Sequence, residues 1–235
     1  DFSSPECLVL LDQADIVVTN PPFSLFRDYV AVLMAHQKHF IIIGNMNAIT
    51  YEDFFPLLKD NKVWIGAKSL NQDMYFDVPD ERKQWLLANK KEGSAYKIIN
   101  GVVMGRLASA CWFTNLDLKK RHEEMILVKH YNPDEYPKYV NYDAIEVAKI
   151  SDIPCDYAGL MGVPITFLDK YNPEQFEIVG ISREVVRTLS DDVRKNGAYP
   201  QIGRFYLNIG AAKYKKVYER LVIRNKHPEP PKEVK

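Results

Sequence analysis

A short apolar stretch that ends in two prolines constrains this chain more than any other part of its sequence. Residues 15–19 read Asp-Ile-Val-Val-Thr, a β-branched run typical of a buried strand in a parallel sheet. Asn20, Pro21, Pro22 and Phe23 follow directly. Because proline fixes its own φ at about −65° and keeps the preceding residue extended, we expect the Asn20 carboxamide to project from the carboxyl end of the strand. Ligands of open α/β sheets bind at that edge, so the turn is a candidate functional site.

The segments around this turn predict an α/β fold with a parallel sheet. Apolar residues recur every three or four positions over 24–36, which predicts an amphipathic helix. A second apolar run at 40–45 predicts another strand, so that strand, helix and strand form a βαβ crossover. Further helices are expected at about 5–12 and 51–60, and a third strand at 62–66.

Beyond residue 66 the regular alternation stops, and the sequence predicts a mixed α+β region. A segment rich in Tyr, Pro, Asn and Asp, 131–142, is expected to be an irregular loop. Strands are expected at 74–78, 96–99, 110–114, 125–128, 163–168, 176–180 and 220–224, and helices at 79–89 and 183–194.

Composition excludes several classes of protein. With 235 residues, of which 46% are hydrophobic and 26% charged, the chain can bury a core. Lys+Arg and Asp+Glu both number 31, so any basic surface for nucleic acid must be local. No window approaches the about 18 consecutive apolar residues of a membrane span, and no signal segment opens the chain. We therefore expect a cytoplasmic protein that does not bind a membrane.

The cysteines and histidines predict neither a disulfide framework nor a metal site. The three cysteines form no C-x-x-C pair, which argues against a common zinc site, and the five histidines show no metal-ligand spacing with cysteine or acid. We therefore assign no metal. These residues are Cys7, Cys111, Cys155, His36, His39, His122, His130 and His227.

The strongest basic cluster is a candidate DNA contact. Lys119, Lys120 and Arg121 are consecutive and could contact phosphates. Glu123 and Glu124 follow at once, so a solvated helix face is the competing interpretation.

The atoms of the Asn-Pro-Pro-Phe turn suit a planar amine. The Asn20 carboxamide oxygen and the Pro21 carbonyl both accept hydrogen bonds, and Pro22 offers no N–H to compete. Phe23 can stack on a ring, a contact worth about 1–3 kcal/mol per base. Two acceptors would orient the amine and stabilise the positive charge that develops on it during methyl transfer, without a general base. The alternative is a rigid strand-to-helix turn without chemistry.

Residues 15–24 resemble the catalytic motif of amino-group methyltransferases that use S-adenosylmethionine. Several longer phrases, in order, resemble the EcoRI-type adenine-specific DNA methyltransferase family, and the resemblance runs from residue 1 to about 180. The phrases are 21–27, 43–45 with 47–51, 112–116 and 161–173.

This resemblance implies a site-specific enzyme of a restriction-modification system. It implies transfer of a methyl group from S-adenosylmethionine to N6 of an adenine flipped out of double-stranded DNA, with Asn20, Pro21, Pro22 and Phe23 as the catalytic residues. It also implies a Rossmann-like methyltransferase sheet with an additional α+β recognition region. Asp1, Phe2 and Asn20 match residues near the cofactor.

The sequence departs from the family pattern in one respect. The glycine-rich cofactor motif is expected upstream of Asp1, and no downstream glycine pair has the strand-Gly-x-Gly-helix context. We therefore expect a fragment without the N-terminal strands, which binds S-adenosylmethionine weakly or not at all and could be inactive by itself. We divide it into 1–66, the C-terminal part of the catalytic core; 67–224, the remaining core strands and a DNA-recognition region; and 225–235, a disordered tail.

Two alternatives stay open at this point. The chain could belong to a methyltransferase of an RNA base or a protein glutamine, or it could be a non-catalytic DNA-binding remnant. The sequence does not give the DNA site, the base-reading residues, a partner endonuclease or the oligomeric state.

Overall fold

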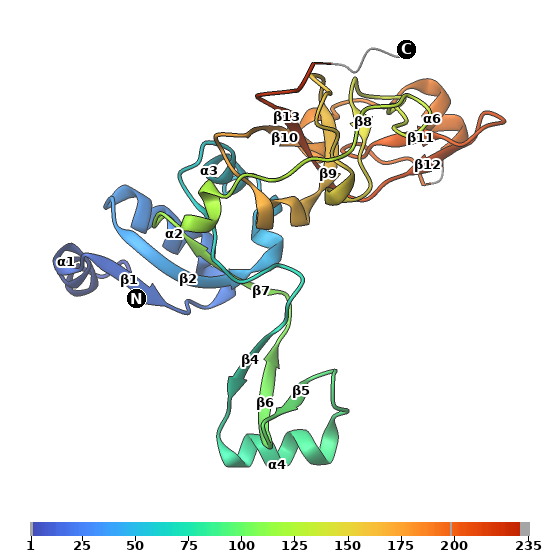
Figure 1. The fold of residues 1–235 in the computed structure, drawn as a ribbon. Coiled ribbons are helices and arrows are strands. Elements are labelled where there is room, and N and C mark those ends of the chain that lie inside the picture. Colours follow the sequence, from blue (N-terminus) through green and yellow to red (C-terminus); the bar gives the residue numbers. More distant parts are fainter. Residues whose placement is uncertain (1, 198, 231–235) are drawn as a thin grey trace. The chain divides into compact units, whose positions relative to one another are not determined.

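The structure is a computed structural model that describes residues 2–197 and 199–230 (Figure 1). The chain folds as two compact units, Asp1–Asp117 and Leu118–Lys235. This division differs from the boundary expected after residue 66, and the functional division into 1–66 and 67–224 stays a prediction. No helix among the described residues is long and apolar enough to cross a membrane.

The sheet of the first unit contains the predicted parallel crossover. Its strand order is β1-β2-β7-β3, and β1 and β2 are parallel, while β7 is antiparallel to β2 and β3. α2 connects β1 to β2, as the sequence predicts. The bounds are β1 Ile16–Thr19, α2 Phe26–Ala35, β2 His39–Asn45, β3 Trp64–Ile65 and β7 Ala110–Thr114.

Capping residues and prolines determine where the helices of this unit begin. The Ser4 side chain accepts a hydrogen bond from the Cys7 N–H and caps α1, Pro5–Gln13. The helix predicted over 51–60 is shorter, because Pro56 is tolerated only in a first turn, so α3 spans Phe55–Lys59. Two 3-10 helices, Phe23–Leu25 and Met46–Thr50, follow the carboxyl ends of β1 and β2.

A cluster of three buried rings forms the centre of this unit. Phe26, Phe54 and Phe113 lie with their ring centroids between 5.0 and 5.4 Å apart. Phe26 packs so closely on β2 that a Cβ at Gly44 would lie 2.3 Å from its Cε2. Glycine is therefore required at this position, and the ring fixes α2 against the strand.

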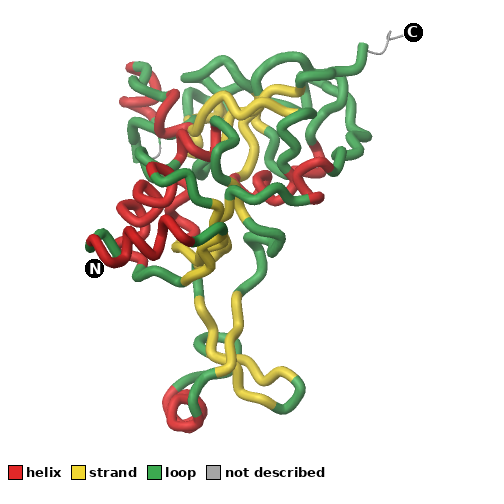
Figure 2. The backbone as a smooth tube through the Cα atoms, turned by 90° about the vertical axis from the view of Figure 1, so that its left-hand side faces the viewer, coloured by secondary structure: helices red, strands yellow, loops and turns green. Residues whose placement is uncertain are grey.

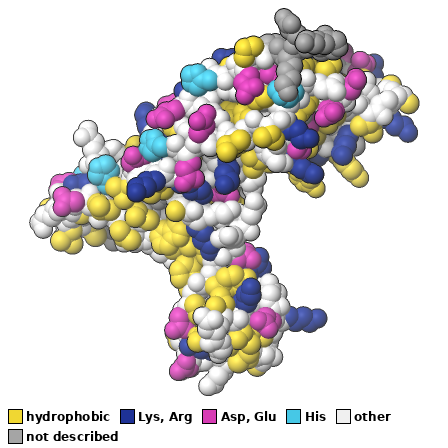
Figure 3. Space-filling view, viewed as in Figure 1, with side chains coloured by type: hydrophobic (Ala, Val, Ile, Leu, Met, Phe, Trp, Pro, Cys, Tyr) yellow, Lys and Arg dark blue, Asp and Glu magenta, His cyan; other side chains and the backbone are white. Residues whose placement is uncertain are grey.

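β1 differs from the buried strand that its sequence predicts. Among the described residues it pairs only with β2, and Ile16 and Val18 are 49% and 67% exposed. Val9 and Leu10 of α1 are also exposed, and Figure 3 shows hydrophobic side chains gathered over α1 and β1. One face of this apolar strand is open to solvent because no described element covers it.

A small antiparallel sheet with its own helix is inserted before β7. Figure 2 shows the helix beside the strands, whose order is β4-β6-β5. Sequence reasoning missed β6, although Asn100 and Gly101, both with positive φ, form the kind of turn that joins hairpin strands. The bounds are β4 Met74–Asp77, α4 Asp80–Asn89, β5 Tyr96–Ile99 and β6 Val102–Leu107.

The second unit is built on a four-stranded sheet of order β10-β13-β9-β8, in which only β8 and β9 are parallel. A hairpin of β11 and β12 accompanies it, and neither strand was predicted. The strands are β8 Ile145–Glu146, β9 Met161–Pro164, β10 Phe176–Ile181, β11 Tyr206–Asn208, β12 Tyr214–Lys216 and β13 Arg220–Asn225. The helices are α5 Ser182–Val185 and α6 Asp191–Asn196, with 3-10 helices Lys119–His122, Ile150–Asp152 and Ile165–Lys170.

Three predictions for this unit are wrong. Residues 125–128 form no strand; the Gln175 side chain, rather than a strand, accepts from the Met125 N–H and donates to its carbonyl. The strand expected at 163–168 ends at Pro164 and continues as a 3-10 helix. The helix expected at 183–194 is two separate helices. The second begins after Ser190, whose side chain caps it by accepting a hydrogen bond from the Val193 N–H.

The sequence predicts a disordered tail that begins at residue 225. Asn225 is the last residue of β13, and the Glu229 N–H donates to the Cys155 carbonyl at 2.9 Å. Residues 231–235 lie outside the described part of the chain.

Gly44→Ala should lower the free energy of unfolding by about 1–3 kcal/mol, because the new methyl group must displace the Phe26 ring. Urea denaturation measures this loss. In a Phe26→Leu background the same substitution should cost less, because the ring that blocks the methyl group is gone. An equal cost in both backgrounds would contradict the packing described.

Candidate active site at the end of β1

Asn20, Pro21, Pro22 and Phe23 lie where the sequence predicts, between β1 and α2. Because Thr19 is paired in parallel with Ile42, both strands end at the same edge of the sheet. The 3-10 turn Phe23–Leu25 then leads into the amphipathic helix. The turn is therefore placed at the edge where α/β sheets bind ligands.

Two acceptors at this edge have no hydrogen-bond partner among the described residues. Asn20 is exposed, and among the described residues none bonds its carboxamide. The Pro22 carbonyl is used, since it accepts from the Leu25 N–H at 2.9 Å. No backbone hydrogen bond of the described residues uses the Pro21 carbonyl, although Pro21 is buried. The turn therefore satisfies its own backbone without consuming the Asn20 carboxamide or the Pro21 carbonyl.

Phe23 has a packing role that the sequence did not reveal. Its half-buried ring packs against a cluster of Ile43, Met74 and Ala110. This contact holds the ring between the end of β2 and the inserted lobe. Only the uncovered part of the ring is available for stacking on a ligand.

A surface hollow of about 840 Å³ lies beside the turn and brings two predicted site residues together, Phe2 and Pro22. The Phe2 ring meets Tyr29 edge-on, with centroids 5.2 Å apart. Burial, with a smaller effect of Cys7, raises the pKa of Tyr29, so its phenol is neutral at physiological pH. Of the other two predicted cofactor residues, Asn20 lies in the turn and Asp1 lies outside the described residues. The hollow is lined by Phe2, Ser3, Pro22, Leu25, Asp28 and Val32.

Two asparagines near the sheet hold backbone rather than ligand. The Asn45 side chain accepts from the Asn47 N–H at 2.9 Å and caps the 3-10 helix after β2. The Asn115 side chain accepts from the Phe40 N–H at 2.9 Å and donates to the Lys38 carbonyl at 2.8 Å. Both asparagines lie in phrases that resemble the methyltransferase family. Their contacts give these phrases a structural role, which is to position β2.

The predicted DNA-contact residues lie in the second unit, in the 3-10 helix Lys119–His122. Lys119 is exposed, whereas Lys120 and Arg121 are half-buried and have interaction partners. Lys119 is thus the most accessible of the three, and contact with DNA stays a prediction.

The mixed α/β fold, with its several sheets, is consistent with a protein of methyltransferase type. A family described as "Adenine-specific methyltransferase EcoRI" matches residues 1–226, and the chain belongs to that family. The resemblance inferred from the sequence is therefore confirmed.

Curated relatives are Type II methyltransferases. The chain is 44% identical to M.EcoRI of Escherichia coli over 202 residues, which cover 85% of this chain and 59% of that protein. It is 37% identical to M.MpnI of Mycoplasma pneumoniae over 231 residues, 96% of this chain and 68% of the relative. It is 39% identical to M.MgeORF184P of Mycoplasma genitalium over 227 residues, 95% and 68% of the two chains. The chain thus spans 59% to 68% of the length of these relatives. No solved structure matches it.

Asn20→Ala should leave the fold intact, with a change in unfolding free energy within about 0.5 kcal/mol, because the side chain is exposed and unbonded among the described residues. Thermal denaturation followed by circular dichroism measures this. A loss of several kcal/mol would instead identify Asn20 as a structural residue of the turn.

Proposed function

We propose that this chain carries the target-base site of an S-adenosylmethionine-dependent DNA methyltransferase that methylates N6 of a flipped-out adenine. One observation carries the proposal: the exposed Asn20 carboxamide and the unused Pro21 carbonyl lie together at the carboxyl edge of a parallel strand pair. Membership of the adenine-specific family supports adenine as the base. Double-stranded DNA in the cytoplasm is the proposed substrate.

The chain's own groups would align and activate the amine. The Asn20 Oδ1 and the Pro21 carbonyl oxygen accept the two N6–H bonds, which turns the nitrogen lone pair toward the methyl donor. As the N–C bond forms, positive charge develops on N6, and these fixed dipoles stabilise it. The surplus proton then leaves to solvent, so no general base is needed. The uncovered part of Phe23 stacks on the base.

When bound, S-adenosylmethionine would supply an electrophilic methyl group, whose bond to sulfur breaks as the bond to N6 forms, with a neutral thioether as the leaving group. The hollow beside Phe2 and Pro22 fits one end of such a molecule, because it combines an aromatic edge with the carboxylate of Asp28 next to the turn. We propose that Phe2, with Asp1, lies near the cofactor's adenine and that Asn20 lies between cofactor and base.

We also propose that β1-β2-β7-β3 is part of a Rossmann-like sheet. The support is the parallel β1–β2 pair together with the open edge and exposed apolar face of β1. An apolar edge strand of this kind is suited to pair with a further strand, and we propose that the strand with the glycine-rich cofactor motif pairs there.

Asn20→Ala should lower DNA adenine methylation by the full-length protein about 10²–10³-fold, the cost of removing one preorganised hydrogen-bond partner of the transition state. Transfer of labelled methyl groups from S-adenosylmethionine to DNA measures the rate. Gln13→Ala is the matched control, since it also truncates an exposed amide and lies at the end of α1, outside the turn.

Each outcome of this assay discriminates between functions. Loss of adenine labelling in Asn20→Ala but not in Gln13→Ala supports the proposal. Labelling of RNA or protein in place of DNA would overturn it in favour of another methyltransferase. A wild-type protein that shifts DNA on gels but labels no substrate would be a binding remnant.

A further inference from the structure

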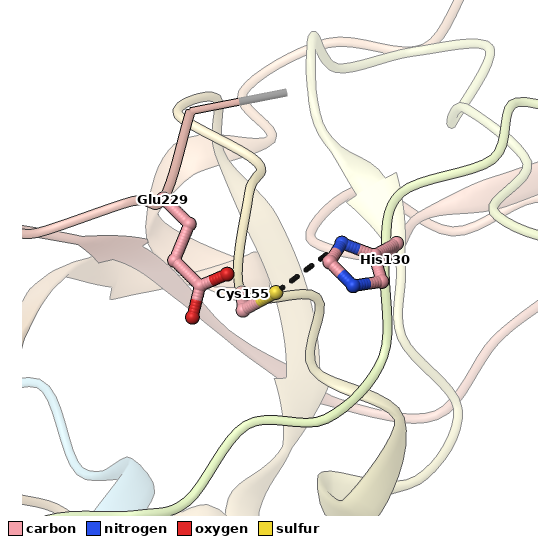
Figure 4. Close-up of side chains that lie close together, drawn as sticks. All are labelled: His130, Cys155 and Glu229. Atoms are coloured by element: carbon pink, nitrogen blue, oxygen red, sulfur yellow. Dashed lines mark hydrogen bonds between the residues drawn. The ribbon is translucent and has the colours of Figure 1, made fainter. Parts of the chain in front are cut away.

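Three side chains with different donor atoms meet in the second unit, and the proposed methyl-transfer chemistry does not use them. His130, Cys155 and Glu229 come from separate loops and point toward one another (Figure 4). The Cys155 Sγ lies 3.5 Å from the His130 Nδ1, and one potential ligand atom of each residue lies within 4.8 Å of the others. They are 25 and 74 positions apart along the chain, so no sequence spacing revealed them.

Backbone hydrogen bonds join all three of these segments. The Glu229 N–H donates to the Cys155 carbonyl at 2.9 Å, and the Cys155 N–H donates to the Lys129 carbonyl at 2.8 Å. The Asn225 side chain also donates to the Cys155 carbonyl, at 3.3 Å. The cluster is therefore tied to the ordered backbone on both sides of the buried cysteine.

A sulfur, a nitrogen and an oxygen donor are the set that zinc accepts. Zinc bonds of about 2.3 Å to sulfur and 2.0–2.1 Å to nitrogen, at a tetrahedral angle, place the two ligand atoms about 3.6 Å apart. The observed separation of 3.5 Å between Sγ and Nδ1 fits this geometry. We propose that His130, Cys155 and Glu229 bind a zinc ion, with water as the fourth ligand.

A buried carboxylate supports the site from behind. Asp156, whose side chain is 7% exposed, accepts from the Tyr131 N–H at 2.7 Å and lies 3.0 Å from the His130 Nδ1. Its negative charge attracts a cation to the site. Because Nδ1 cannot bind a metal and donate a hydrogen bond at the same time, binding of zinc by Nδ1 replaces its contact with Asp156.

The environment of the thiol favours metal binding over nucleophilic chemistry. The Cys155 thiol is buried, and a carboxylate oxygen of Glu229 lies within 4.8 Å of its Sγ. A divalent cation would replace the thiol proton and be attracted by this carboxylate. Access is available, because Cys155 and Glu229 line a hollow of about 500 Å³.

Metal titration of the purified protein tests the site. After treatment with a chelator, the wild type should take up one Zn²⁺ per chain in competition with a chromophoric chelator, and Co²⁺ should produce a thiolate-to-cobalt charge-transfer band. Cys155→Ser should abolish the band, and Glu229→Gln should weaken Zn²⁺ binding at least about 10-fold, since even changes behind a ligand cost 10–100-fold. Zn²⁺ should also raise the melting temperature of the wild type.

Cys7→Ser is the matched control, because it removes another thiol that lies in the first unit. It should retain the cobalt band. Glu229→Gln keeps the test valid if Cys155→Ser fails to fold, since Glu229 is exposed and its backbone hydrogen bond survives. Zinc binding by the wild type no tighter than by the folded Glu229→Gln variant would overturn the proposal, as would a cobalt band that depends on Cys7.

Discussion

The parallel pairing of β1 with β2 is the constraint on which the rest of the first unit depends. It brings the ends of both strands to one edge, where the prolines hold Asn20 outward. The position of β2 depends in turn on the Phe26 ring over Gly44 and on the Asn115 side chain at its first residues. The family phrases around the turn thus serve two purposes, since some position the strand and others face the ligand edge.

Local chemistry made much of this unit predictable. The sequence predicts the crossover from a β-branched run, the Asn-Pro-Pro-Phe turn and an amphipathic helix. These features are informative because strands and helices differ in the spacing of their apolar residues. Exposure was not predictable, because the sequence of an apolar strand does not show which elements cover its faces. Ile16 and Val18 are exposed because no described element covers their face of β1. The open acceptors of the turn follow from the sequence, whereas the packing of Phe23 on Met74 required the inserted lobe.

The second unit was less predictable, because long-range side-chain contacts replace regular pairing there. The Gln175 side chain, 50 positions away, forms hydrogen bonds with the backbone N–H and carbonyl of Met125. The apolar run at this residue therefore forms no strand, although its sequence is typical of one. The cluster of His130, Cys155 and Glu229 is assembled in the same way, from loops distant in sequence. A methyltransferase built on this chain would therefore combine a base site formed by local sequence with a metal site formed by the tertiary fold.

The central claim is that Asn20 accepts a hydrogen bond from the amino group of the target base. It is tested most directly by measuring how tightly wild type and Asn20→Ala bind the DNA target site when its adenine is replaced by purine, which lacks that amino group. The account predicts that removing the amino group weakens binding by the wild type about tenfold more than binding by Asn20→Ala, because the wild type loses the hydrogen bonds to Asn20 and to the Pro21 carbonyl, whereas the variant loses only the one to Pro21. An equal loss for both proteins would contradict it.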